Sequence, residues 1–185
     1  MNKALAVALV VAAAASGCAT DESRAKRAKN PAPCPPVIVL KDAARMVEFV
    51  GEQTLENVAY SAEFVKAELD CRYFSDRPIE ATLKVEMAFG KGPKADANRH
   101  AFGYWVAVTR KDSEVIEKVD YLLPIEFGGE EKMRIVTDKV DEIVIPRASK
   151  DISGTNFEIV VGFALTPQQA IFNRSGKSLK FPEAK

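Results

Sequence analysis

Alternation of apolar and polar residues is the dominant pattern along the chain from residue 37 onward. In the clearest run, residues 79–89, every second residue is apolar, and most of the residues between are Glu, Thr or Lys. Such a period of two is typical of a strand with one face in the core and the other in water. Residues 115–127 and 157–165 repeat the pattern, and Pro124 favours an edge position or a bulge for the first of them.

Weaker alternation predicts four further strands, at residues 37–40, 57–69, 102–110 and 133–145, the last with a break near Asp138. Residues 42–52 are ambiguous and allow one helical turn. The short polar segments 111–113 and 128–131 are typical of hairpin turns. About seven strands without a repeated helical pattern predict a mainly β domain. We expect an antiparallel, immunoglobulin-like β-sandwich, with a small β-barrel as the alternative.

One short helix is predicted directly after the last strand. Thr166 is a suitable N-cap, Pro167 fits the first helical position, and Gln169 stands where a capping box needs it. Gly176 can end this helix. We expect the helix to pack over one end of the sandwich.

The N-terminus indicates export from the cytoplasm. Lys3 precedes an apolar run, residues 4–15, that is too short to cross a bilayer, which needs roughly 20 residues. This layout is typical of a secretory signal peptide. Ala15-Ser16-Gly17-Cys18 resembles the lipobox of bacterial lipoprotein precursors, although Leu is more usual at the first position. The resemblance implies removal of residues 1–17 and acylation of Cys18, including a palmitate-type chain. Ala19 implies transport to the outer membrane, and an ordinary secreted protein is the alternative.

Cysteine usage agrees with a lipoprotein. The chain has three cysteines, Cys18, Cys34 and Cys71. Acylation of Cys18 would leave an even pair, and the periplasm is an oxidising compartment. A Cys34–Cys71 disulfide is therefore predicted, and it would stabilise the fold by roughly 3–4 kcal/mol. Two unpaired thiols are the alternative.

Residues 18–33 are predicted to be a lipidated cysteine followed by a disordered tether, since residues 19–33 hold no large apolar side chain. Residues 34–174 would form the sandwich domain and residues 175–185 a basic tail. The zero net charge of the chain conceals an uneven distribution. The tether has four basic and two acidic residues, whereas residues 34–173 have 17 basic against 23 acidic residues. An acidic body between basic ends is compatible with a position beside an anionic membrane.

Three segments give a wider resemblance. They are Cys34-Pro35-Pro36-Val37 through Asp42-Ala43, Ala62-Glu63-Phe64 through Cys71, and the closing stretch from Val161-Gly162-Phe163 through Gln168-Gln169, followed by Asn173-Arg174. Together they resemble a family of proteobacterial envelope lipoproteins and span most of residues 34–174. The resemblance implies an envelope location. It implies no activity, and so it assigns no functional residues.

Few residues suggest catalysis. The single histidine, His100, lies in a predicted polar loop, which gives no catalytic triad and no multi-histidine zinc site. Residues 90–94 lack the context of a phosphate loop, because Pro93 removes an amide donor. The many carboxylates are best explained as surface solvation. We therefore expect no catalytic residues, no metal and no cofactor.

The composition, 47% hydrophobic and 28% charged residues, is that of an ordinary globular protein, and the pI near 6.6 does not favour a nucleic-acid partner. Tyr104 and Trp105 form a candidate interaction surface, because both aromatic types are common at binding hot spots. The sequence thus favours a non-enzymatic, lipid-anchored module that contacts another envelope protein from the periplasmic side of the outer membrane. A small-ligand or lipid carrier with an apolar cavity is the alternative, and a carboxylate-based enzyme ranks below both.

Overall fold

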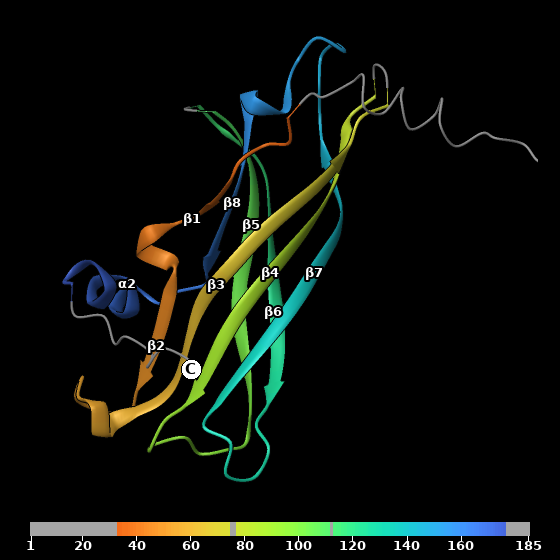
Figure 1. Ribbon diagram of the computed structural model, residues 1–185. Coiled ribbons are helices and arrows are strands. Elements are labelled where there is room, and N and C mark those ends of the chain that lie inside the picture. The colour runs from red at the N-terminus through yellow and green to blue at the C-terminus, as the bar shows by residue number, and fades with distance from the viewer. Residues whose placement is uncertain (1–32, 75–76, 112, 177–185) are drawn as a thin grey trace, which may run out of the picture. The chain divides into compact units, whose positions relative to one another are not determined.

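The computed structural model describes residues 33–74, 77–111 and 113–176, which form eight strands, three 3-10 turns and one helix (Figure 1). The predicted signal peptide and Cys18, most of the predicted tether and most of the basic tail lie outside these residues. The strands are β1 (Val37–Val39), β2 (Arg45–Phe49), β3 (Val58–Arg72), β4 (Ile79–Lys91), β5 (Arg99–Arg110), β6 (Val115–Glu126), β7 (Met133–Ile145) and β8 (Phe157–Phe163). The helix α2 covers Pro167–Arg174.

The strands form two four-stranded sheets that pack face to face. Sheet A has the order β1-β8-β5-β6, and sheet B has the order β2-β3-β4-β7. Sheet B lies in front of sheet A in Figure 1. All pairings are antiparallel except that of β1 with β8. The predicted β-sandwich is confirmed, and no closed barrel forms because each sheet ends in an edge strand on either side.

Most predicted strands occur within a few residues of their expected bounds. β2 is the one strand beyond the seven that were predicted. It lies in the ambiguous stretch 42–52, after a 3-10 turn over Lys41–Ala43. This turn moves the chain from sheet A, where β1 pairs with β8, to sheet B, where β2 pairs with β3. A five-residue strand that contains both Arg45 and Glu48 shows too little alternation for the pattern to identify it.

The segment 128–131 is a tight turn, with the Glu131 amide donating to the Gly128 carbonyl at 2.7 Å. It is not the hairpin turn that its composition predicts, because it joins β6 in sheet A to β7 in sheet B. Pairing partners decide this outcome. In the described part of the chain, β6 pairs only with β5 and β7 only with β4, so β6 and β7 are edge strands of different sheets and do not pair with each other.

The core lies between the sheets and consists of the inward residues of the alternating strands. From β4 it includes five side chains without exposed surface, namely Ile79, Leu83, Val85, Met87 and Phe89. The equivalent face of β6 is buried only toward its C-terminal end, and Val119 is 40% exposed. β6 is an edge strand, as Pro124 predicted, and so only one neighbouring strand covers it.

Helix α2 begins with the predicted capping box. The Thr166 hydroxyl accepts from the Gln169 amide, and the Gln169 side chain accepts from the Thr166 amide. The helix then closes the free edge of β2 with its side-chain amides. Gln169 Nε2 donates to the Val47 carbonyl at 3.1 Å, and Asn173 Nδ2 donates to the Asp42 and Arg45 carbonyls at 2.8 Å each. Phe172 packs beneath the helix against Val47.

We expect Asn173→Ala to lower the free energy of unfolding by about 1–2 kcal/mol, because it removes the shared donor of two main-chain carbonyls. Urea denaturation followed by circular dichroism measures this loss. Ile171→Ala is the matched control in the same helix: Ile171 is 67% exposed, and its removal should leave stability nearly unchanged. Equal effects of the two substitutions would contradict this role of Asn173.

Candidate functional site

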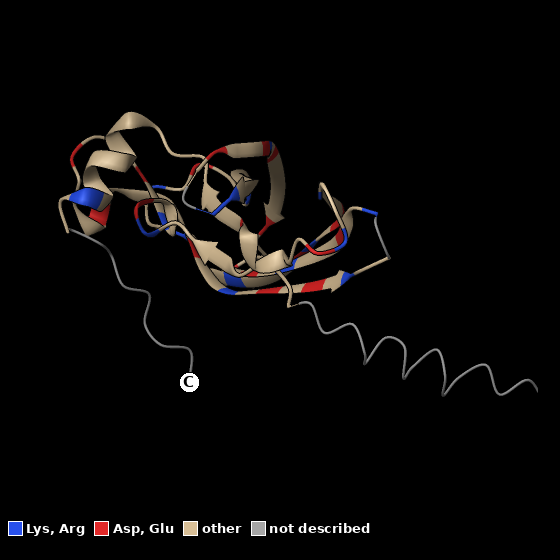
Figure 2. Ribbon diagram, turned by 90° about the horizontal axis from the view of Figure 1, so that it is seen from above, with Lys and Arg blue, Asp and Glu red and all other residues tan. Residues whose placement is uncertain are grey.

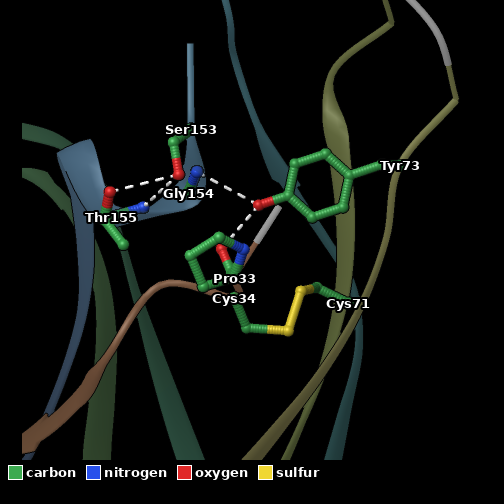
Figure 3. The surroundings of a disulfide bond; sticks show 7 residues. All are labelled: Pro33, Cys34, Cys71, Tyr73, Ser153, Gly154 and Thr155. Atoms are coloured by element: carbon green, nitrogen blue, oxygen red, sulfur yellow. Dashed lines mark hydrogen bonds between the residues drawn. A yellow bond between two sulfur atoms is a disulfide. The ribbon is translucent and has the colours of Figure 1, made fainter. Parts of the chain in front are cut away.

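The start of the domain is covalently joined to the end of β3. Cys34 and Cys71 form a disulfide with their Cα atoms 5.8 Å apart, which confirms the predicted pairing (Figure 3). Cys71 is the penultimate residue of β3, the strand that lies between β2 and β4 in sheet B. The N-terminal segment is therefore attached directly to an interior strand and not only to the three-residue edge strand β1.

A tyrosine adds a second attachment beside the disulfide. The Tyr73 hydroxyl donates to the Pro33 carbonyl at 2.7 Å and accepts from the Gly154 amide at 3.1 Å (Figure 3). A Cβ atom at Gly154 would lie 2.4 Å from both the Pro33 oxygen and the Tyr73 hydroxyl, so only glycine fits there. The guanidinium of Arg147 lies 5.1 Å from the centre of the Tyr73 ring. Together with the disulfide, these contacts hold Pro33 and Cys34 against the end of β3 and the 3-10 turn Gly154–Asn156.

Tyr104 and Trp105, the predicted interaction residues, lie on opposite sides of β5. Tyr104 faces the core and is only 1% exposed, so its side chain is not part of a surface. Trp105 lies on the outer side of sheet A, where its indole Nε1 donates to the Phe163 carbonyl at 3.2 Å. Its ring lies against Gly162, since a Cβ there would be 2.7 Å from Trp105 Cζ2. The alternation of a strand separates adjacent residues in this way.

An apolar strip, the Trp105 face, continues from Trp105 across the outer side of sheet A. It consists of Ala101, Gly103, Trp105, Leu122 and Pro124. Gly103 pairs with Leu122, and Ala101 pairs with Pro124, so the strip crosses from β5 to β6 without interruption. Leu122 is 72% exposed, which is high for an aliphatic side chain within a strand. Lys118, whose ammonium lies 5.5 Å from the Trp105 ring centre, and its ion-pair partner Asp120 border the strip.

The outer side of sheet B is charged instead. Ion pairs join Lys66 to Glu68 at 2.7 Å and Lys139 to Asp141 at 2.8 Å. Lys84 and Glu86 of β4 belong to the same surface, where they line a shallow depression together with Lys66 and Glu68. Figure 2 marks the acidic and basic positions along the ribbon. The outer surface of sheet B thus carries charged pairs together with the half-exposed Ile135 and Val144, whereas the outer surface of sheet A presents the continuous Trp105 face.

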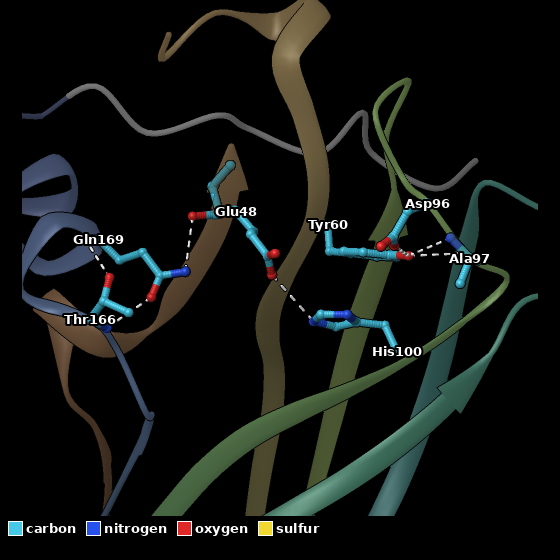
Figure 4. A network of polar contacts seen from close by, with 8 residues as sticks. Glu48, Tyr60, Asp96, Ala97, His100, Thr166 and Gln169 are labelled. Carbon is cyan, nitrogen blue, oxygen red and sulfur yellow. Dashed lines mark hydrogen bonds and ion pairs between the residues drawn. The ribbon is translucent and has the colours of Figure 1, made fainter. Parts of the chain in front are cut away.

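A polar cluster that the sequence did not suggest surrounds His100. His100 belongs to β5 and not to a loop, and its ring stacks on Tyr60 with 3.9 Å between ring centres (Figure 4). Its Nε2 lies 3.4 Å from Glu48 Oε2, while the Tyr60 hydroxyl donates to Asp96 Oδ1 at 2.9 Å. Burial raises the pKa of Tyr60. The cluster joins β2, β3, β5 and the loop before β5.

The cavities differ in size and lining. One of about 640 Å³ lies on the outer side of sheet B among charged residues such as Arg72, Glu80 and Lys139. One of about 420 Å³ lies between β2 and α2, and one of about 170 Å³ opens between β6 and β7. Within the described residues, no group of three or more His, Cys, Asp or Glu is arranged to hold a metal ion. No helix among them is long and apolar enough to cross a membrane.

Comparison with protein-family models, with curated proteins and with solved structures found no match to this chain.

Replacing both cysteines (Cys34→Ser with Cys71→Ser) is expected to lower the free energy of unfolding by about 3–4 kcal/mol, because the crosslink restricts the unfolded chain. Urea denaturation of the oxidised protein and of the double variant measures the difference. The unsubstituted protein in excess reductant is the control and should match the variant. A loss of less than about 1 kcal/mol would contradict a stabilising role of this size.

Tyr104 gives the fold a dependence on alkaline pH. Its hydroxyl donates to Asp138 Oδ2 at 2.7 Å, and burial, reinforced by this bond and by the charge of Asp138, raises the pKa of Tyr104 well above its ordinary value. In the unfolded chain the same group ionises near its ordinary pKa of about 10. The folded state therefore binds more protons above that pH, and its stability falls as the pH rises.

We expect the urea midpoint to fall between about pH 8 and pH 11, and to fall less in Tyr104→Phe, which lacks the ionisable group. Circular dichroism at both pH values measures the two midpoints. For each protein, the urea midpoint at pH 11 is compared with the midpoint of the same protein at pH 8. The hydrogen bond that Tyr104→Phe lacks is missing at both pH values, so the difference reports the ionisation of Tyr104. An identical decrease in both proteins would exclude Tyr104 as a contributor.

Proposed function

We propose that the protein is a bacterial lipoprotein, anchored in the outer membrane through Cys18 and facing the periplasm. In this proposal it has no enzymatic activity and acts as an interaction or structural module in envelope assembly or maintenance. The main support is the Trp105 face, an apolar strip on one outer surface of a sandwich whose opposite outer surface is charged. Contiguous exposed apolar patches mark protein-binding surfaces, and Trp is enriched at binding hot spots.

The attachment at Cys34 supports the anchored arrangement. If the chain before Cys34 is anchored in a membrane, the disulfide would connect that anchor directly to β3, an interior strand of sheet B. The acidic composition of residues 34–173, with 17 basic and 23 acidic residues, would also keep the body away from anionic head groups. The domain would then remain accessible to partners in the periplasm.

The cavities give less support to a carrier of small ligands or lipids. The opening between β6 and β7, about 170 Å³, is smaller than the roughly 300 Å³ expected of a ligand pocket. The cavities of about 640 Å³ on the outer side of sheet B and about 420 Å³ between β2 and α2 exceed that size, but they are bordered by charged or polar side chains such as Arg72, Glu48 and Gln168. An interaction surface therefore has the better support.

Photo-crosslinking in living cells tests the proposal. A photoreactive amino acid replaces either Leu122 on the Trp105 face or Lys66 on the charged surface, and crosslinked products are identified by mass spectrometry. We expect position 122, and not position 66, to capture a specific envelope protein, because an apolar strip loses unfavourable water contact on binding. Equal yields from both positions, or no product from position 122, would count against the proposal.

Two substitutions serve as controls in the same cells. Leu122→Asp should reduce capture from a photoreactive residue at position 101 without changing stability, since the Leu122 side chain is largely exposed. Cys18→Ser removes the acyl acceptor, and the chain should then no longer sediment with the membranes. Membrane association that persists in Cys18→Ser would contradict the proposed anchor.

A further inference from the structure

One long edge of the sandwich is open. β6 ends sheet A and β7 ends sheet B on the same side of the molecule, and neither pairs with a further strand among the described residues. The opposite side is different, since the side-chain amides of α2 occupy the β2 carbonyls there. An open edge of this length can accept another strand through its main-chain groups.

The pairing of β6 with β5 determines which N–H and C=O groups of β6 point to the open side. The Gly103 carbonyl accepts from the Ala164 amide at 2.9 Å, so the main-chain groups of Gly103 point away from β6. Gly103 pairs with Leu122, and in an antiparallel pair both residues point toward each other or both point away. Leu122 therefore directs its N–H and C=O to the open side, as do Lys118 and Asp120 by alternation.

These three residues define a short acceptor segment with natural limits. Pro124, the next residue of the same orientation, has no N–H to donate. Beyond it, the Glu126 carbonyl already accepts from the guanidinium of Arg134. At the other end a bulge at Val108/Thr109 interrupts the pairing of β5 with the start of β6. An added strand can thus form a regular ladder only along residues 118–122.

A groove leads from this edge into the core. It has a volume of about 170 Å³ and opens between β6 and β7. Val106 and Val108 of β5, each 4% exposed, line it together with Ile143 of β7. Val119, on the inner side of β6 and 40% exposed, stands at its rim. A groove of this size holds about one large aliphatic or aromatic side chain.

The charged residues that line the groove are all acidic. They are Glu117, Asp141 and Glu142. Asp141 is paired with Lys139, whereas neither Glu117 nor Glu142 forms an ion pair with another described residue. Glu142 also has a positive φ of 62°, an uncommon conformation for a residue with a side chain, at a bulge in the pairing of β7 with β4. Basic side chains beside an apolar one would complement this rim.

We propose that β6 binds an extended segment of a partner protein, which pairs with the main chain of Lys118, Asp120 and Leu122. One apolar side chain of that segment fills the groove over Val106 and Val108, and Lys or Arg residues two positions away, on the same face of the segment, face Glu117 and Glu142. The inference rests on the proposed function as an interaction module and specifies how the partner binds. It also places the bound segment next to Leu122 of the Trp105 face.

The test uses the purified full chain in mild detergent and a capped peptide of sequence Thr-Lys-Thr-Leu-Thr-Lys-Thr as the probe, in which Leu and both Lys residues share one face. Hydrogen exchange of the β6 amides, measured by NMR, should slow about ten-fold at Lys118, Asp120 and Leu122 when the peptide is added, because these amides gain acceptors. Amides of β6 that already pair with β5 should not change. Exchange that stays fast at all three positions would overturn the proposal.

Charge variants and peptide variants test the recognition separately. Glu117→Lys with Glu142→Lys should weaken binding of the peptide about ten-fold in fluorescence anisotropy. Glu130→Lys with Glu131→Lys, in the turn after β6, makes the same change in net charge at a distance and should leave binding nearly unchanged. A peptide with Pro at its centre should not bind, because it cannot complete the ladder. Equal binding by the Pro peptide, or equal weakening by both double variants, would also overturn the proposal.

These outcomes are distinct from failure of the proposed function. If the peptide does not bind but a photoreactive residue at position 122 still captures an envelope protein, strand addition is excluded and the interaction module remains. If neither experiment gives a signal, both proposals fail.

Discussion

The packing of sheet A against sheet B is the interaction on which the other features depend. Five inward side chains of β4 are fully buried in it, and β5 and β8 supply the facing residues. Because strands alternate, fixing the inward set also fixes the outward set. The outer strip that contains Trp105 and Leu122, and the charged surface around Lys66, are consequences of the same register.

The two sides of the sandwich satisfy their main-chain groups differently. On the β2 side, Gln169 and Asn173 of α2 donate hydrogen bonds to main-chain carbonyls. The disulfide joins Cys34, which precedes β1, to Cys71 of β3. On the β6 side, nothing in the described residues occupies the outward groups of residues 118–122. An open edge is a liability for a folded protein, and native proteins usually cover such edges or interrupt them. Pro124 and the bulge at Val108/Thr109 shorten this one without closing it.

Prediction succeeded where the information is local and failed where it depends on partners. Strands such as residues 79–89, the capping box at Thr166 and the edge position of Pro124 follow from periodicity and residue chemistry, and the structure agrees with each. The Cys34–Cys71 pair could be predicted because only two cysteines remained after Cys18. The hairpin predicted at 128–131 was wrong, since a turn sequence does not state which sheet each neighbouring strand joins.

The sequence by itself determined the class of fold, the helix and the disulfide, because alternation, capping and cysteine number act over short distances or leave few choices. Tertiary structure alone decided the strand order, which of Tyr104 and Trp105 faces the core, and the stacking of His100 on Tyr60. It also decided that β6 and β7 end their sheets side by side, with a groove between them. Those features arise from long-range pairing, in which each strand takes the neighbour that best buries the shared apolar face.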